Sequence, residues 1–154
     1  MLRRSLNRGD DIMDKRQLLE DWYQRVWING DLDAIDELFT PDTQAAGVIP
    51  EMQMGPDEFR ELVPMFLNMV ENPTVSLDMV MEDGDWASAL YSMRVTDAAT
   101  GKPVMGTGQL FARFDGDKMV ETYNSFDFMS FFEQIGLLPE QSLALCLTGQ
   151  RIGA

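Results

Sequence analysis

The 154-residue chain contains no histidine and a single cysteine, Cys146. Without histidine, proton transfer near neutral pH has to use aspartate, glutamate or tyrosine side chains. One cysteine can form neither an intrachain disulfide nor a cysteine-based metal site, so we expect no metal ion and no other cofactor. Low cysteine usage suits a reducing compartment, and the cytoplasm is the expected location.

Basic residues and long apolar runs are also scarce. Twelve Lys and Arg residues stand against 26 Asp and Glu residues, which gives a formal net charge of −14. This charge repels nucleic acid and anionic membrane surfaces, so neither is an expected partner. No apolar run approaches the length of a membrane span. Residues 1–13 lack the apolar segment of a secretory signal, and we expect them to form a disordered N-terminal arm.

Motifs for nucleotide and nucleophile chemistry are missing too. The sequence has no glycine-rich phosphate loop and no nucleophile elbow. The Asp-Gly-Asp segments at 83–85 and 115–117 lack the later ligands and the terminal glutamate of a calcium loop. We interpret both segments as turns.

Apolar residues recur at helical spacing over three segments, 18–29, 31–39 and 55–70. The second helix is expected to end before Pro41. Pro64 should kink the third helix, because proline removes a backbone donor and clashes with the preceding turn. We expect the connection between these two helices to be irregular, with short strands at most at 44–49 and 52–54.

From residue 74 the pattern changes to that of four long strands, at 74–82, 86–96, 104–114 and 118–126. Asp-Gly pairs in two of the three connections are typical of tight hairpins. An antiparallel meander that follows three helices is an α+β order.

A curved sheet of this kind, covered by the N-terminal helices, would form a cone-shaped pocket. Gly106 and Gly108 would help the third strand to bend, or would allow a ligand to approach closely. We expect one domain over residues 14–148 and a tail at 149–154.

Asp127 is the best-placed residue for acid–base chemistry. It follows the last strand, precedes an apolar helix at 128–135, and has Phe and Met residues around it in the sequence. Apolar surroundings disfavour a charged carboxylate, so that it can take up and return a proton. Aspartate is also a favoured helix N-cap, and on the residues alone this purely structural interpretation is equally good.

Three segments carry a family resemblance: WINGDLDAIDELF at 27–39, TGKPV at 100–104, and FDGDKMVE at 114–121 with the following Phe126-Asp127 and QIG at 134–136. They are similar to the SnoaL-like polyketide cyclases, also called ester cyclases, of the nuclear-transport-factor-2-like (NTF2-like) superfamily. The resemblance implies an NTF2-like cone. It also implies that Asp127 is the acid/base of an intramolecular aldol closure that needs no metal or nucleotide.

Four further residues are candidates for binding the substrate. Tyr123, which stands where relatives carry Trp, shares a strand face with Asp127 if no bulge intervenes. Gln109 on the neighbouring strand could hold a carbonyl oxygen if the hairpin register allows. The resemblance places Trp27 near a pocket mouth, and Met105 belongs to a methionine-rich set that suits a flat ligand. For Tyr123, Trp27 and Met105, ordinary core packing is the alternative.

These features predict a cofactor-independent enzyme that acts on a small apolar carbonyl compound by cyclase-type chemistry. The alternative is a non-catalytic small-molecule-binding module, because a fold does not fix a function. Apolar residues such as Leu90, Met93, Leu110 and Phe111 are distributed over both faces of the predicted sheet. We therefore expect a homodimer that covers the convex face.

Overall fold

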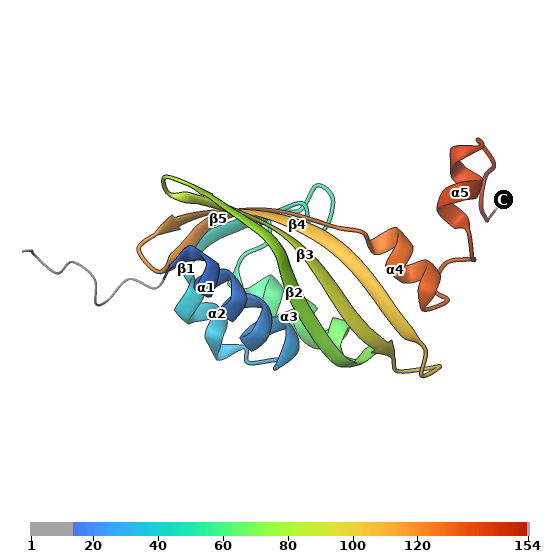
Figure 1. Ribbon diagram of the computed structural model, residues 1–154, viewed down its shortest axis with the longest axis horizontal. Coiled ribbons are helices and arrows are strands. Elements are labelled where there is room, and N and C mark those ends of the chain that lie inside the picture. The colour runs from blue at the N-terminus through green and yellow to red at the C-terminus, as the bar shows by residue number, and fades with distance from the viewer. Residues whose placement is uncertain (1–13, 154) are drawn as a thin grey trace, which may run out of the picture.

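The computed structural model describes residues 14–153, so the arm expected over residues 1–13 lies outside the described residues. Helices cover one face of a five-stranded sheet that curls without closing (Figure 1). This arrangement confirms the predicted α+β fold with N-terminal helices on a curved sheet. Within residues 14–153, no helix is long and apolar enough to cross a membrane.

The first predicted helix is present, but its second half is wider than an α-helix. α1 (Lys15–Asp21) runs directly into the π-helix η1 (Trp22–Ile28). Asp14 caps α1 by accepting the N–H of Gln17 at 2.7 Å. The remaining helices are α2 (Asp33–Leu38), α3 (Pro56–Leu67), α4 (Phe128–Gln134) and α5 (Ser142–Leu147).

The four predicted strands form the antiparallel part of the sheet. They are β2 (Val70–Asp83), β3 (Trp86–Asp97), β4 (Pro103–Asp115) and β5 (Lys118–Phe126). Consecutive strands pair with one another, as expected for a meander.

A fifth strand makes the sheet mixed rather than purely antiparallel. β1 (Phe39–Ala46) lies parallel to β5 at the edge of the sheet (Figure 1). The prediction of an irregular connection was wrong here, because the residues before 44 already belong to this strand. Of the short strands expected at 44–49 and 52–54, the structure has the end of β1 and a single bridge between Ala45 and Met54.

Pro41 is the reason that the sequence pattern does not predict β1, because proline cannot donate a hydrogen bond to a neighbouring strand. It lies in a stretch where the pairing with β5 is interrupted. There the hydroxyl of Thr43 donates to the carbonyl oxygen of Met119 at 2.7 Å, so a side chain supplies the link between the strands. An edge strand tolerates proline when such a substitute is available.

Side chains alternate between an inner face, covered by the helices, and an outer face. On β4 every second residue from Val104 to Phe114 is buried and belongs to the inner face. The pairing of β5 with β4 shifts between Arg113 and Phe114, so that Arg113 faces Glu121 whereas Phe114 faces Met119. This bulge sets which residues of β5 point inward.

Two glycines on the inner face of β4 allow aromatic rings to lie directly on the strand. A Cβ atom at Gly106 would stand 2.3 Å from Cζ of Phe126, and one at Gly108 would stand 2.3 Å from Cζ of Tyr91. The close approach that glycine permits is therefore used by side chains of the protein itself.

Candidate functional site

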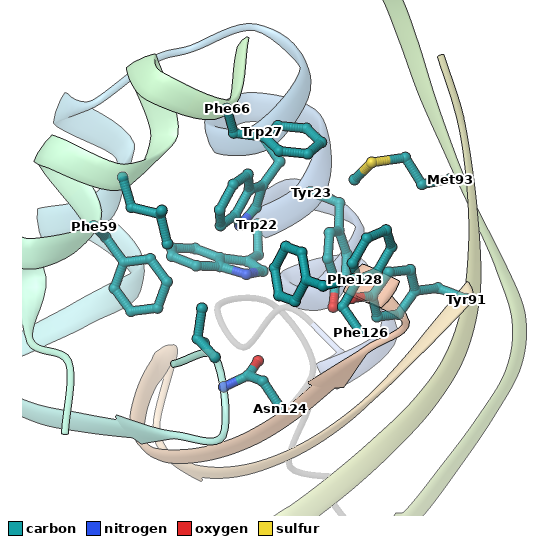
Figure 2. A pocket seen from close by; sticks show the side chains of 12 residues that line it. Trp22, Tyr23, Trp27, Phe59, Phe66, Tyr91, Met93, Asn124, Phe126 and Phe128 are labelled. Carbon is teal, nitrogen blue, oxygen red and sulfur yellow. The ribbon is translucent and has the colours of Figure 1, made fainter. Parts of the chain in front are cut away.

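A cavity of about 60 Å³ lies between the helices and the inner face of the sheet (Figure 2). Eight of its twelve lining residues are aromatic. η1 contributes Trp22, Tyr23 and Trp27, and the sheet contributes Tyr91 and Phe126. The site is thus an apolar, aromatic chamber formed where the curl of the sheet meets the helices.

Contacts between rings hold the helical side of this chamber in place. Trp22 stacks on Phe39, with ring centroids 4.5 Å apart, and meets the edge of Phe59 at 5.3 Å. Trp27 meets the edge of Phe66 at 5.6 Å. Such pairs add to the stabilisation from burial, so this part of the wall is preformed.

The chamber is small in this conformation. An apolar cavity of about 150 Å³ is enough to hold one benzene molecule. At 60 Å³ this cavity holds less than one ring, so a cyclic ligand requires part of the wall to move. Phe128 belongs to the short helix α4 and also lines the cavity.

Tyr23 and Tyr91 bring polar atoms into the aromatic wall. Their rings lie 4.6 Å apart (Figure 2), and their hydroxyl groups are close enough to share a hydrogen bond. Burial raises the pKa of Tyr91 to about 12, although the hydrogen bond with Tyr23 lowers it. Burial, the electrostatic effect of the neighbouring Tyr91 phenol and a hydrogen bond with it raise the pKa of Tyr23 well above its ordinary value. Both phenols therefore keep their protons at neutral pH.

Asn124 on β5 is the third source of polar atoms in the wall, beside the tyrosines and the tryptophan N–H groups. Its Nδ2 atom donates to the carbonyl oxygen of Ala46 at 3.2 Å and to Oγ1 of Thr122 at 3.1 Å. Because a carbonyl oxygen can only accept, these contacts fix which end of the amide carries the nitrogen.

Asp127 is exposed and is not among the residues that line the cavity. Its Oδ1 atom accepts the N–H of Ser130 at 3.0 Å, which caps α4. The apolar surroundings expected for this carboxylate are not observed. Its two neighbours in sequence, Phe126 and Phe128, do line the cavity, so Asp127 stands between two residues of the wall.

Of the four candidate binding residues, the structure places only Trp27 on the cavity wall. Tyr123, Gln109 and Met105 all stand on the outer face of the sheet, where Tyr123 stacks on Trp86 with centroids 6.2 Å apart. The expected shared face of Tyr123 and Asp127 is the exposed one. Strand alternation and the bulge in β5 turn these side chains away from the cavity.

The hydroxyl of Tyr123 donates instead to Glu121, which also accepts a hydrogen bond from Arg113 at 2.8 Å. These two hydrogen bonds lower the pKa of Glu121. Within residues 14–153, no three His, Cys, Asp or Glu side chains come together in a group that could hold a metal ion.

Sequence reasoning missed Tyr91, Asn124, Phe126 and Phe128 as wall residues. A signal for Tyr91 was available, because it belongs to an alternating set of apolar residues on β3 that includes Ala89 and Met93. No equivalent signal exists for Asn124, since the phase of β5 depends on the bulge.

Solved structures with the same fold come from several bacteria. TsrD from Streptomyces laurentii is 18% identical and superposes with a TM-score of 0.68 over 82% of this chain and 99% of that chain. IdmH from Streptomyces antibioticus, provisionally described as a polyketide cyclase, is 19% identical, with a TM-score of 0.69 over 79% of this chain and 97% of that chain. AclR from Streptomyces galilaeus, provisionally described as a hydroxylase, is 17% identical, with a TM-score of 0.70 over 87% of this chain and 88% of that chain.

At these identities the similarity establishes the NTF2-like fold that all four chains share. No curated protein matches the sequence. The model of the SnoaL-like domain family matches residues 19–122, which is well over half of the chain. The protein therefore belongs to the SnoaL-like domain family.

Proposed function

We propose that the inner cavity binds a small, flat, apolar carbonyl compound and that the protein closes a ring in it by cofactor-independent, cyclase-type aldol chemistry. The aromatic wall carries this proposal, because it favours transfer of an apolar ring out of water and offers few polar contacts. The provisional description of IdmH as a polyketide cyclase supports the reaction class.

In this reaction Asp127 serves as the acid/base at the rim of the cavity. One carboxylate oxygen caps α4, and the other makes no hydrogen bond within the described residues. That oxygen takes a proton from the carbon next to a carbonyl group, which leaves an enolate. The enolate carbon forms a C–C bond with a second carbonyl carbon of the same molecule, and the resulting alkoxide takes the proton back. The product is a β-hydroxy ketone, with no net oxidation or reduction.

A non-catalytic binding module is the second candidate function. The exposure of Asp127 and its use as a helix cap favour this candidate, because neither requires a proton-transfer role. Both candidates require ligand binding in the cavity. Titration of the Trp86→Phe variant with acetophenone tests this shared requirement, because its tryptophan fluorescence then comes from Trp22 and Trp27 alone. Saturable quenching supports both candidates, and unchanged fluorescence contradicts both.

We also propose that the active form is a homodimer in which the outer sheet faces pack together. Met79, Met81, Leu90 and Phe111 form an exposed apolar patch on this face, with between 39% and 64% of each residue accessible. The residues lining this patch carry no charge, although the whole chain has a net charge of −14. Two copies therefore repel each other least when these faces meet, so a second copy is the best occupant.

Light scattering at micromolar concentration is expected to show a dimer of twice 17.5 kDa. Met81→Glu should yield monomers, because each interface would have to bury two unpaired carboxylates. Met65→Glu is the matched control, since Met65 on α3 is 64% exposed, as Met81 is, and lies away from the sheet. A monomeric wild-type protein, or equal behaviour of the two variants, contradicts this interface.

A further inference from the structure

The amide of Asn124 is held so that its oxygen points into the cavity. Both contacts of its side chain use Nδ2, to Ala46 and to Thr122. Figure 2 shows Oδ1 directed toward the aromatic side chains. The loop after β1 fixes the backbone at the same point, because a Cβ atom at Gly47 would lie only 2.1 Å from the carbonyl oxygen of Asn124. Oδ1 is thus a positioned acceptor in an apolar wall.

Whereas Asn124 offers a hydrogen-bond acceptor, the Tyr23–Tyr91 pair offers a hydrogen-bond donor. Two phenols carry two hydroxyl protons, and a hydrogen bond between Tyr23 and Tyr91 can use at most one of them. The other remains available to a ligand. Gly108 lets the Tyr91 ring lie against β4, since a Cβ atom there would stand 2.3 Å from its hydroxyl oxygen. The pair is therefore a positioned donor on the same wall as Asn124.

We infer that the cavity selects a ring compound with two polar groups: a carbonyl oxygen that accepts the free O–H of the Tyr23–Tyr91 pair, and a hydroxyl or enol O–H that donates to Oδ1 of Asn124. The inference rests on the proposed binding of a carbonyl compound and narrows it to hydroxylated or enolised aryl ketones. An unpaired polar group in such a wall costs more than a made hydrogen bond contributes, so ligands that lack either group bind less tightly.

Four single-ring probes of nearly equal size separate these contacts: ethylbenzene, acetophenone, 4-ethylphenol and 4-hydroxyacetophenone. Calorimetric titration of the wild-type protein should give the tightest binding for 4-hydroxyacetophenone and the weakest for ethylbenzene. Each added hydrogen bond is expected to strengthen binding by about 2- to 12-fold. This comparison uses only the wild-type protein, so it does not depend on the stability of a variant.

Two variants then assign each contact to its residue. The double variant Tyr23→Phe/Tyr91→Phe removes both O–H groups of the pair, so it should weaken the binding of the two ketones by the same factor and leave that of ethylbenzene unchanged. Asn124→Leu should weaken the binding of the two phenolic probes, 4-ethylphenol and 4-hydroxyacetophenone. It should leave the binding of ethylbenzene and acetophenone unchanged. Leu62→Met is the matched control, because it changes a lining residue without adding a strong hydrogen-bonding group, and it should preserve the ranking of the probes.

The results distinguish this inference from the proposal on which it rests. If all four probes bind wild type with the same affinity, the cavity binds rings but the selection of two polar groups is wrong. If Tyr23→Phe/Tyr91→Phe and Asn124→Leu each weaken the binding of all four probes equally, their effect is structural and the inference is again wrong. If not even the two ketones bind, the proposed function itself fails.

Discussion

Asp127→Asn is expected to lower the turnover number by about 10²- to 10⁴-fold while leaving the stability of the fold close to that of wild type. Asparagine caps a helix about as well as aspartate, so the hydrogen bond to the N–H of Ser130 is kept. The amide cannot take a proton from a carbon acid at neutral pH. Single-turnover kinetics on a converted substrate and chemical denaturation measure the two quantities separately.

Asp127→Ala is the companion variant, because it removes both the cap and the carboxylate. It should lose about 0.5–2 kcal/mol of stability together with turnover. If the Asn variant keeps the full wild-type rate, Asp127 is only a cap and the acid/base assignment is wrong. If wild type and variant both bind acetophenone but convert no carbonyl substrate, the binding-module candidate is favoured.

Phe131→Ala is expected to destabilise the protein by about 3–5 kcal/mol. Phe131 is 1% exposed and joins α4 to the core, with its ring centroid 5.4 Å from that of Phe66 and 5.9 Å from that of Phe126. Truncation leaves a cavity beneath α4, the helix that carries Phe128 to the chamber wall. Weaker probe binding should therefore accompany the loss of stability. Urea denaturation measures the change in unfolding free energy.

Leu147→Ala on the neighbouring helix α5 serves as the control. Leu147 is 80% exposed, so its truncation should change stability by no more than about 0.5 kcal/mol. Gln134 gives α4 a second attachment, since its side-chain amide exchanges hydrogen bonds of 2.8 and 3.1 Å with the backbone of Met105. A loss below about 1 kcal/mol in Phe131→Ala would show that these polar contacts, not the buried ring, hold the helix.

The sequence pattern predicted the strands but not the register in which they pair. The period-2 pattern and the Asp-Gly turn predicted the last strand over 118–126, and β5 has these bounds. It could not show the shift of pairing near Phe114, because a bulge depends on contacts between strands. One residue of shift exchanges the two faces of a strand. This is why Tyr123 was expected in the pocket, whereas the structure places Asn124 there.

Asp127 and Trp27 show what a local pattern can and cannot establish. Helical spacing predicted the helix that contains Trp27, and the family resemblance placed this residue near the pocket mouth; in the structure it lines the cavity. The order of strand, aspartate and apolar helix predicted the position of Asp127 at the start of α4. Its exposure depends on the direction in which α4 leaves the sheet, and packing of Phe131 against the distant Phe66 helps to set that direction.

A crystal structure of the protein soaked with 4-hydroxyacetophenone tests the central claim most directly. We expect the probe inside the aromatic chamber, between the Trp22 side and Phe126, with its ketone oxygen at the tyrosine pair and its hydroxyl at Asn124. Phe128 should have moved outward, because the cavity of 60 Å³ is smaller than the ring. Ordered probe on the outer face beside Met79 and Phe111, with the chamber unchanged and empty, would contradict the assignment of the inner cavity as the functional site.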